Sequence, residues 1–171
     1  MNNGKMTAKR LAELALLTAA ALIIFIVELQ IPPLTEIPGI KPGLANIITV
    51  YCVYRYKPWE TALVVTARVI LGAVFAAGFM TIIFSAAGAL LCLLGMIPVS
   101  RLFPKLPVWA CSIIGAVLHN TGQTAAAVIC LGSFAVLGYF PFLLLGGIIS
   151  GTFTGLCAQF VISRIKSGKG S

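Results

Sequence analysis

Arg68 is the residue whose position says most about chemistry, because it lies near the middle of an apolar stretch at 60–78. A guanidinium at the centre of a membrane helix costs about 2.5–3.5 kcal/mol on insertion scales, so it must face a polar interior, a partner group or a ligand. Its planar fork can bind two oxygens of a carboxylate or phosphate at once. The alternative is structural pairing with Glu28 or with backbone carbonyls. Arg68 is therefore a candidate anion-binding residue.

A second group of polar side chains lies near the middle of a later apolar stretch. His119 and Gln123 are four residues apart and share one helix face, while Asn120 and Thr124 form a polar stripe beside it. In lipid such groups must point inward, either to hydrogen-bond other helices or to line a pocket. Together with Arg68 they favour a pocket.

A third element is the string Lys41-Pro42-Gly43-Leu44-Ala45-Asn46. Pro42 suits the first turn of a helix, and the free amides there, with Lys41 and Asn46, could meet an anionic group. The candidate substrate-binding residues are thus Arg68, His119, Asn120, Gln123, Asn46 and Lys41. This set favours an anionic or carbonyl-rich small molecule with apolar bulk. Candidate aromatic walls are Phe25, Phe75, Phe79, Tyr139 and Phe142.

Catalytic chemistry finds little support in the sequence. The chain has four glutamates and no aspartate, whereas metal-dependent phosphoryl or prenyl chemistry needs clustered carboxylates. A single histidine leaves no serine or cysteine with a plausible base, and no GxxxxGK[ST] nucleotide loop is present in a strand–helix context. Five cysteines without paired spacing are typical of small buried hydrophobes. We expect no catalytic residue, no metal and no cofactor.

The composition indicates an all-α integral membrane protein. Hydrophobic residues make up 60% of the 171 residues and charged residues 9%, against about 45–50% and about 25% in soluble domains. A lone strand in lipid would leave its backbone unsatisfied, so the spans must be helices of about 20 residues. The predicted single domain, 1–171, is a bundle of six transmembrane helices at about 11–30, 43–55, 60–78, 80–100, 107–131 and 138–163. The second is short and covers only about 20 Å.

The basic residues indicate how this bundle is oriented. With the N-terminus inside, ten of the twelve basic residues fall on the inner side of the predicted spans. The positive-inside rule then places both termini in the cytoplasm. We attribute the net charge of +8 to basic residues that set the orientation of the helices in the lipid membrane. We therefore expect no nucleic-acid partner.

Two further segments carry predictions. Four prolines between 32 and 42 prevent a continuing helix, and we interpret 31–42 as an outer lid over the bundle, the alternative being a structural connector. Small residues at Ala12, Ala15 and Ala19 allow close helix approach and are a candidate docking face for another membrane protein. The glycine stripe at 147, 151 and 155 favours packing inside the bundle.

These strings resemble a known family. The residues Lys41-Pro42-Gly43-Leu44-Ala45-Asn46-Ile47, Arg68 with Leu71-Gly72, and His119-Asn120 with Gly122-Gln123 are similar to the Gx transporter family, also called heptaprenyl diphosphate synthase component I. The resemblance spans about 8–164, and Pro42 departs from the family's pattern. The family is similar in layout to the S components of energy-coupling-factor (ECF) transporters. The resemblance implies six helices, cytoplasmic termini, an outer loop over the site and an alanine-rich first helix that docks on a coupling subunit.

The resemblance also implies a function. It points to a substrate-binding subunit in a bacterial plasma membrane that takes up a vitamin-like molecule or an isoprenoid or quinone precursor, with a transmembrane coupling protein and ATPases as separate partners. The alternative is a non-catalytic membrane subunit beside a prenyl (heptaprenyl) diphosphate synthase, an enzyme class that needs the aspartates this chain lacks. A third option is a stand-alone carrier with Glu28 as its coupling-ion site.

Overall fold

The computed structural model describes residues 7–31, 43–76 and 79–167, except for the side chains at 79, 81, 166 and 167. These residues form six α-helices and one 3-10 helix, and no strand occurs among them. The helices are α1 (Ala8–Gln30), α2 (Asn46–Arg55), α3 (Pro58–Phe75), α4 (Phe79–Leu102), α5 (Val108–Leu131), η1 (Phe134–Tyr139) and α6 (Phe140–Ser167). The all-helical prediction is confirmed. The predicted lid and Lys41 lie at 32–42, outside the described residues.

Five of the helices are long and apolar enough to cross a membrane. They cover Ala8–Gln30, Pro58–Phe75, Ile82–Leu102, Val108–Leu131 and Phe134–Ile165. The other helix, α2, has 10 residues and is about 15 Å long, so it cannot span the hydrocarbon core by itself. The sequence marked this element as short, and the structure buries Thr49, Val50, Cys52 and Val53 of α2 inside the bundle.

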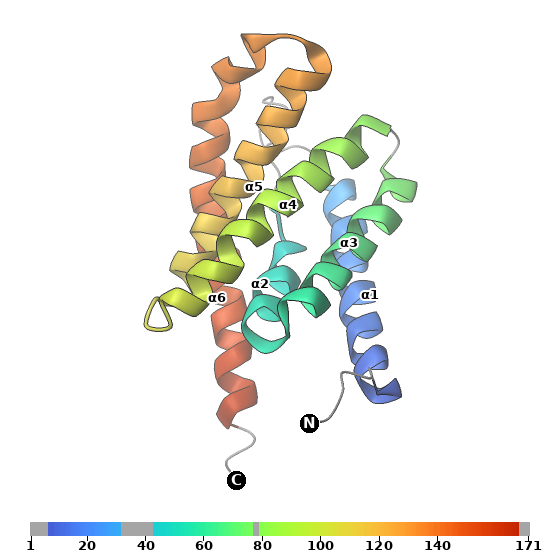
Figure 1. The fold of residues 1–171 in the computed structure, drawn as a ribbon, viewed down its shortest axis with the longest axis vertical. Helices are drawn as coiled ribbons and strands as arrows, with labels where there is room; N and C mark the ends of the chain where they lie inside the picture. Colours follow the sequence, from blue (N-terminus) through green and yellow to red (C-terminus); the bar gives the residue numbers. More distant parts are fainter. Residues whose placement is uncertain (1–6, 32–42, 77–78, 168–171) are drawn as a thin grey trace.

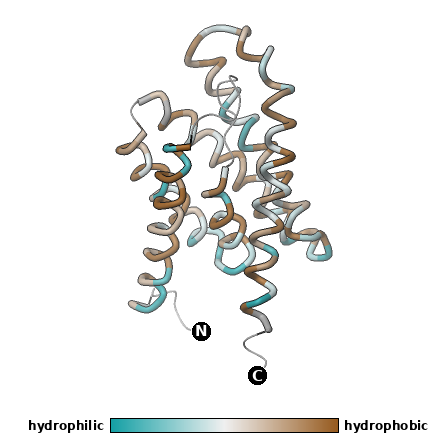
Figure 2. Tube along the Cα trace, turned by 180° about the vertical axis from the view of Figure 1, so that it is seen from behind, coloured by the Kyte–Doolittle hydropathy of each residue, from teal (hydrophilic) through white to brown (hydrophobic). Residues whose placement is uncertain are grey.

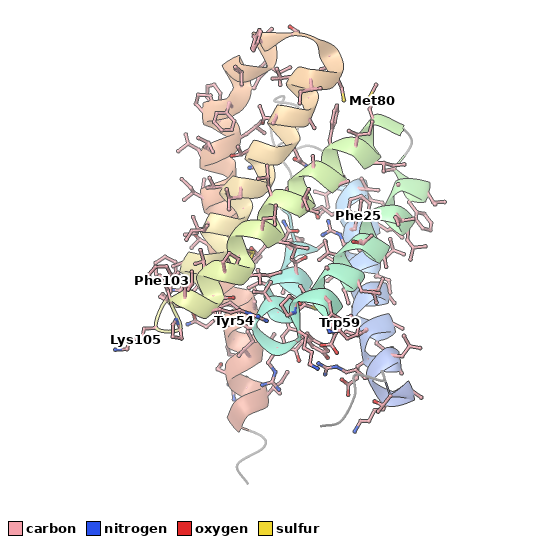
Figure 3. All side chains as sticks on the ribbon, viewed as in Figure 1. Phe25, Tyr54, Trp59, Met80, Phe103 and Lys105 are labelled. Carbon is pink, nitrogen blue, oxygen red and sulfur yellow. The ribbon has the colours of Figure 1, made fainter. Side chains whose placement is uncertain are left out.

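The first and last described helices have their outer ends on the same side of the bundle, as expected for a chain that crosses the membrane an even number of times. Figure 1 shows the start of α1 and the end of α6 at the same end of the molecule, with the η1 turn at the opposite end. Hydrophilic segments gather at the end where α1 begins (Figure 2). Lys105 and Trp59 lie toward this end, whereas Met80 lies toward the other (Figure 3). We call the end where α1 begins the basic end.

Glycines allow α4, α5 and α6 to pack backbone against backbone. A Cβ added at Gly122 of α5 would lie 2.5 Å from the carbonyl oxygen of Ala87 on α4. The glycine stripe of α6 faces α5, where a Cβ at Gly151 would lie 2.9 Å from the Cα of Ile113. Nearby, a buried hydroxyl pair, Ser112 Oγ and Thr154 Oγ1 at 3.1 Å, joins the same two helices. The stripe therefore serves packing inside the bundle, as the sequence favoured.

At the basic end, one arginine ties α1 to α3. Arg10 donates from Nε and Nη2 to the two carboxylate oxygens of Glu60, both at 2.9 Å, and its guanidinium lies 4.0 Å from the Tyr56 ring centroid. Desolvation raises the pKa of the Tyr56 phenol, so the ring stays neutral beneath the cation. Glu60 also accepts the backbone N–H of Lys57 at 2.8 Å, which caps α3. We call this set of four residues the Arg10 clamp.

The cysteines follow their predicted role only in part. Cys52, Cys92 and Cys111 are buried and free, in agreement with the prediction of small buried hydrophobes. Cys130 is exposed on the outside of α5, since its position on the helix turns it away from the neighbouring helices.

Candidate ligand-binding cavity

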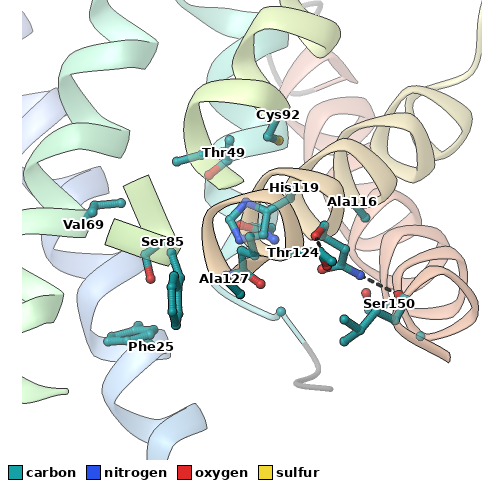
Figure 4. Close-up of a pocket in the computed structure, with 18 of the residues that line it drawn as sticks. Phe25, Thr49, Val69, Ser85, Cys92, Ala116, His119, Thr124, Ala127 and Ser150 are labelled. Atoms are coloured by element: carbon teal, nitrogen blue, oxygen red, sulfur yellow. Dashed lines mark hydrogen bonds between the residues drawn. The ribbon is translucent and has the colours of Figure 1, made fainter. Parts of the chain in front are cut away.

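The bundle encloses a cavity of about 620 Å³, to which all six α-helices and η1 contribute (Figure 4). Cavities that hold small organic ligands measure about 300–1,000 Å³. Its polar lining side chains are Glu28, Asn46, Thr49, Arg68, Ser85, His119, Asn120, Gln123, Thr124, Tyr139 and Ser150. The remaining walls are mostly apolar. A concave, mainly apolar space with a few convergent polar groups is the usual form of a small-molecule site.

The cavity brings together five of the six residues that the sequence singled out. Arg68 comes from α3, Asn46 from the start of α2, and His119, Asn120 and Gln123 from α5. Lys41 lies outside the described residues. That these residues bind a ligand stays a prediction.

Arg68 reaches the cavity without a carboxylate partner. Its Nη1 donates to Asn46 Oδ1 at 3.2 Å, and the guanidinium carbon lies 5.7 Å from the Phe25 ring centroid. Within the described residues, both ion pairs with N···O distances up to 4.0 Å belong to Arg10. The direct pairing of Arg68 with Glu28, which the sequence left open, is therefore not formed. Since a guanidinium carries five N–H donors, Arg68 retains capacity for oxygens of a guest.

Glu28 is engaged elsewhere in the same wall. Its side chain is buried at the end of α1, and its Oε1 accepts the backbone N–H of Gly43. Gly43 has a φ of +67°, a left-handed conformation that glycine adopts without strain. This contact joins the end of α1 to the chain that enters α2, so Glu28 positions the cavity wall.

The polar residues of α5 have two roles: some pack against a neighbouring helix, and others line the cavity. Asn120 donates from Nδ2 to the carbonyl oxygen of Leu143 on α6 at 2.6 Å, which is the interhelical hydrogen bonding that the sequence left as an alternative. His119 and Gln123 instead face α4, where Gly88 makes room for them. A Cβ added at Gly88 would lie 2.8 Å from Gln123 Cγ and 3.0 Å from His119 Cε1. Figure 4 shows His119 projecting from α5 among the lining residues.

The aromatic walls were predicted only in part. Phe25 and Tyr139 line the cavity, as does Phe84, which the sequence did not single out. Phe75 and Phe142 are wrong as wall residues, because neither is among the residues that line the cavity. The side chain of Phe79 is not among those described.

Other lining residues were missed altogether. Thr49, Ser85 and Ser150 line the cavity, but each is an isolated small polar residue in an apolar helix. Such residues commonly bond their own helix backbone, as Ser150 does with Gly147 at 3.4 Å. No spacing signal in the sequence distinguishes the lining ones.

Two further predictions, the alanine docking face and the absence of a metal site, do not involve the cavity. Ala12, Ala15 and Ala19 are exposed along α1, and their role as a docking face stays a prediction. No group of three histidine, cysteine or acidic side chains that could hold a metal ion occurs in the described part of the chain.

A helical bundle with five membrane-length helices indicates the class: a multi-pass membrane protein, here with an interior cavity of about 620 Å³. The family model described as heptaprenyl diphosphate synthase component I matches residues 17–161. The chain therefore belongs to the heptaprenyl diphosphate synthase component I family. No curated protein and no solved structure matches it.

Proposed function

We propose that this chain is a substrate-binding membrane subunit, similar to the S components of ECF transporters, that captures a small anionic molecule for uptake. The observation that carries the proposal is the Arg68 guanidinium, which lines a cavity of about 620 Å³ and has no carboxylate oxygen within 4.0 Å among the described residues. A cation held at this depth is costly unless something compensates it. An anionic vitamin-like molecule, or an isoprenoid or quinone precursor, is the compensating guest.

The lining groups have separate roles in this proposal. Arg68 binds the negative head of the ligand through a charge-assisted hydrogen bond. Asn46, whose Oδ1 holds Arg68 in place, together with His119 and Gln123, sets the orientation of the head. Asn120 supports the wall through its bond to α6.

The energy for uptake comes from other proteins in this proposal, because the chain carries no nucleotide-binding loop. The basic end holds both described termini (Figure 1) and, by the positive-inside rule, faces the cytoplasm of the plasma membrane. Ala12, Ala15 and Ala19 lie exposed on α1, starting close to that end. Small residues let a partner helix approach closely, so this face would contact a transmembrane coupling protein that is joined to ATPases.

The proposal is tested by asking what the purified protein retains. Small molecules carried through gentle purification into lipid nanodiscs are identified by mass spectrometry and then titrated onto Arg68→Gln. The loss of one hydrogen bond to a charged group weakens affinity by about 10- to 100-fold. The matched control is Arg101→Gln, an exposed arginine at the end of α4. Unchanged affinity in Arg68→Gln would remove this residue from the site.

A second function is favoured by the family's description. In that reading the chain is a non-catalytic membrane subunit that recruits or tunes a soluble prenyl diphosphate synthase. Affinity purification from the native membrane separates the two: co-purification of a coupling protein with ATPases supports uptake, and co-purification of a prenyl synthase supports the second function.

A further inference from the structure

The polar groups of the cavity gather toward one end. Along α5 the lining residues are Ala116, His119, Asn120, Gln123 and Thr124, followed by Ala127 and Leu131. The first part of this wall is therefore mainly polar, and the part nearer to η1 is apolar.

The walls from α2 and η1 show the same division. Asn46 and Thr49 of α2 line the cavity beside Arg68, and α2 lies in the half of the molecule toward the basic end (Figure 1). The opposite end is formed by Ala135 and Val136 of η1 and by Leu131, and η1 also contributes the polar lining residue Tyr139. The cavity thus has a polar end near α2 and an apolar end near η1.

The dimensions suit an elongated guest. From His119 to Leu131 the wall of α5 rises by twelve residue steps, which is about 18 Å at 1.5 Å per residue. The apolar part beyond Thr124 covers seven residues, or about 10 Å. A compact polar head therefore has room for an apolar tail of about 10 Å beside it.

The charges limit the head. Among the described lining residues, Arg68 is the one cation and Glu28 the one carboxylate. A single guanidinium matches a carboxylate, whose two oxygens it can bind together. Because Glu28 offsets the charge of Arg68 in these walls, a head with a single negative charge is repelled less than a diphosphate, and the chain has no aspartate to hold a magnesium ion with a diphosphate.

Resting on the proposed function, we infer that the ligand is an amphipathic carboxylate whose head binds at Arg68 and whose tail extends along α5 toward η1. Prenyl carboxylates test this, with 3,3-dimethylacrylate, geranate and farnesoate as tails of five, ten and fifteen carbons. The diphosphates with the same tails are tested in parallel, so that the two types of polar head can be compared. Binding is measured by titration onto the protein in nanodiscs, with empty nanodiscs subtracted.

The expected pattern has three parts. Geranate binds at least about 10-fold more tightly than 3,3-dimethylacrylate, because it buries more apolar surface. Each carboxylate binds more tightly than the diphosphate with the same tail. Arg68→Gln weakens all three carboxylates by about the same factor, in the range of about 10- to 100-fold.

Variants at the apolar end locate the tail. Ala127→Leu fills this end and is expected to weaken geranate and farnesoate by about 10-fold or more, while leaving 3,3-dimethylacrylate unchanged. Val136→Phe in η1 gives the same result without altering the packing of α4 against α5. The matched control is Ala125→Leu, which places the same side chain on the exposed face of α5 and leaves all three affinities unchanged.

The outcomes separate this inference from the proposed function. If no probe of either head class binds, this inference is overturned, while the proposed function is decided separately by the small molecules that the protein retains through purification. If a diphosphate binds more tightly than the carboxylate with the same tail, the inferred carboxylate head is wrong, while the proposed role as a substrate-binding subunit stands. If tail length has no effect, or if Ala127→Leu and Val136→Phe leave geranate binding intact, the placement of the tail is wrong while capture at Arg68 stands.

Discussion

The Arg10 clamp supports a quantitative prediction about stability. Glu60 is 4% exposed and holds Arg10 through two hydrogen bonds of 2.9 Å. Removing one partner of a fully buried ion pair costs about 3–5 kcal/mol. The Arg10 side chain is 33% exposed, so water replaces part of the lost interaction, and Glu60 keeps the N–H of Lys57. We expect Arg10→Ala to lower the free energy of unfolding by about 2–3 kcal/mol.

The measurement is a double-mutant cycle in mixed micelles, with unfolding by a denaturing detergent followed by far-ultraviolet circular dichroism. Arg10→Ala, Glu60→Ala and the double variant give the coupling energy of the pair, which we expect to be about 1–2 kcal/mol. Glu13→Gln is the matched comparison, because this carboxylate also contacts Arg10, at 3.2 Å, but is 39% exposed. It should cost less than about 1 kcal/mol.

A coupling energy below about 0.5 kcal/mol would refute this reasoning, since the pair would then act like an ordinary surface contact. The clamp also bears on the cavity, because α1 carries Phe25 and Glu28 into its wall. Loosening α1 in Arg10→Ala is therefore expected to weaken ligand binding at a distance from the site. Arg10→Lys keeps the charge but not the two-pronged geometry and should fall between the parent and Arg10→Ala in stability.

Three other outcomes are expected. Gly122→Val should lower stability by about 1–3 kcal/mol, because an added Cβ lies 2.5 Å from the Ala87 carbonyl oxygen, whereas Gly138→Val should be neutral because nothing lies within 4 Å of a Cβ there; equal melting temperatures would contradict the packing argument. Ser112→Ala removes one hydroxyl of the buried pair between α5 and α6 and should cost about 1 kcal/mol, measured by the same unfolding titration. Lys105→Cys should react with a membrane-impermeant maleimide only in inside-out vesicles, compared with the parent chain; reaction in right-side-out vesicles would reverse the proposed topology.

The helices themselves were predictable because lipid allows so few alternatives. Apolar runs of membrane length must be helical, and charges at their ends mark where they stop. The six predicted segments overlap the six observed α-helices, and the short second segment is the short α2. Residues 132–137 lie between two predicted spans, but the 3-10 helix η1 at Phe134–Tyr139 was not anticipated, because no residue pattern there is specific to a 3-10 helix.

The candidate site was predictable as a set of residues but not as a geometry. Polar side chains inside an apolar helix must turn inward, which was enough to choose Arg68, His119 and Gln123. Their partners depend on which helices meet and at what depth. Only the fold shows that Asn46 rather than Glu28 accepts the hydrogen bond from Arg68, and that Asn120 is used to hold α6.

The sequence alone thus determined the class of the protein, the number and order of its α-helices, and the residues that cannot face lipid, because these follow from local composition and from the energy of transfer into a bilayer. The tertiary structure decided the rest. Phe25 lines the cavity and Phe142 does not, although both are aromatic residues in apolar helices. What separates them is contact between segments far apart in the chain, which no local pattern encodes.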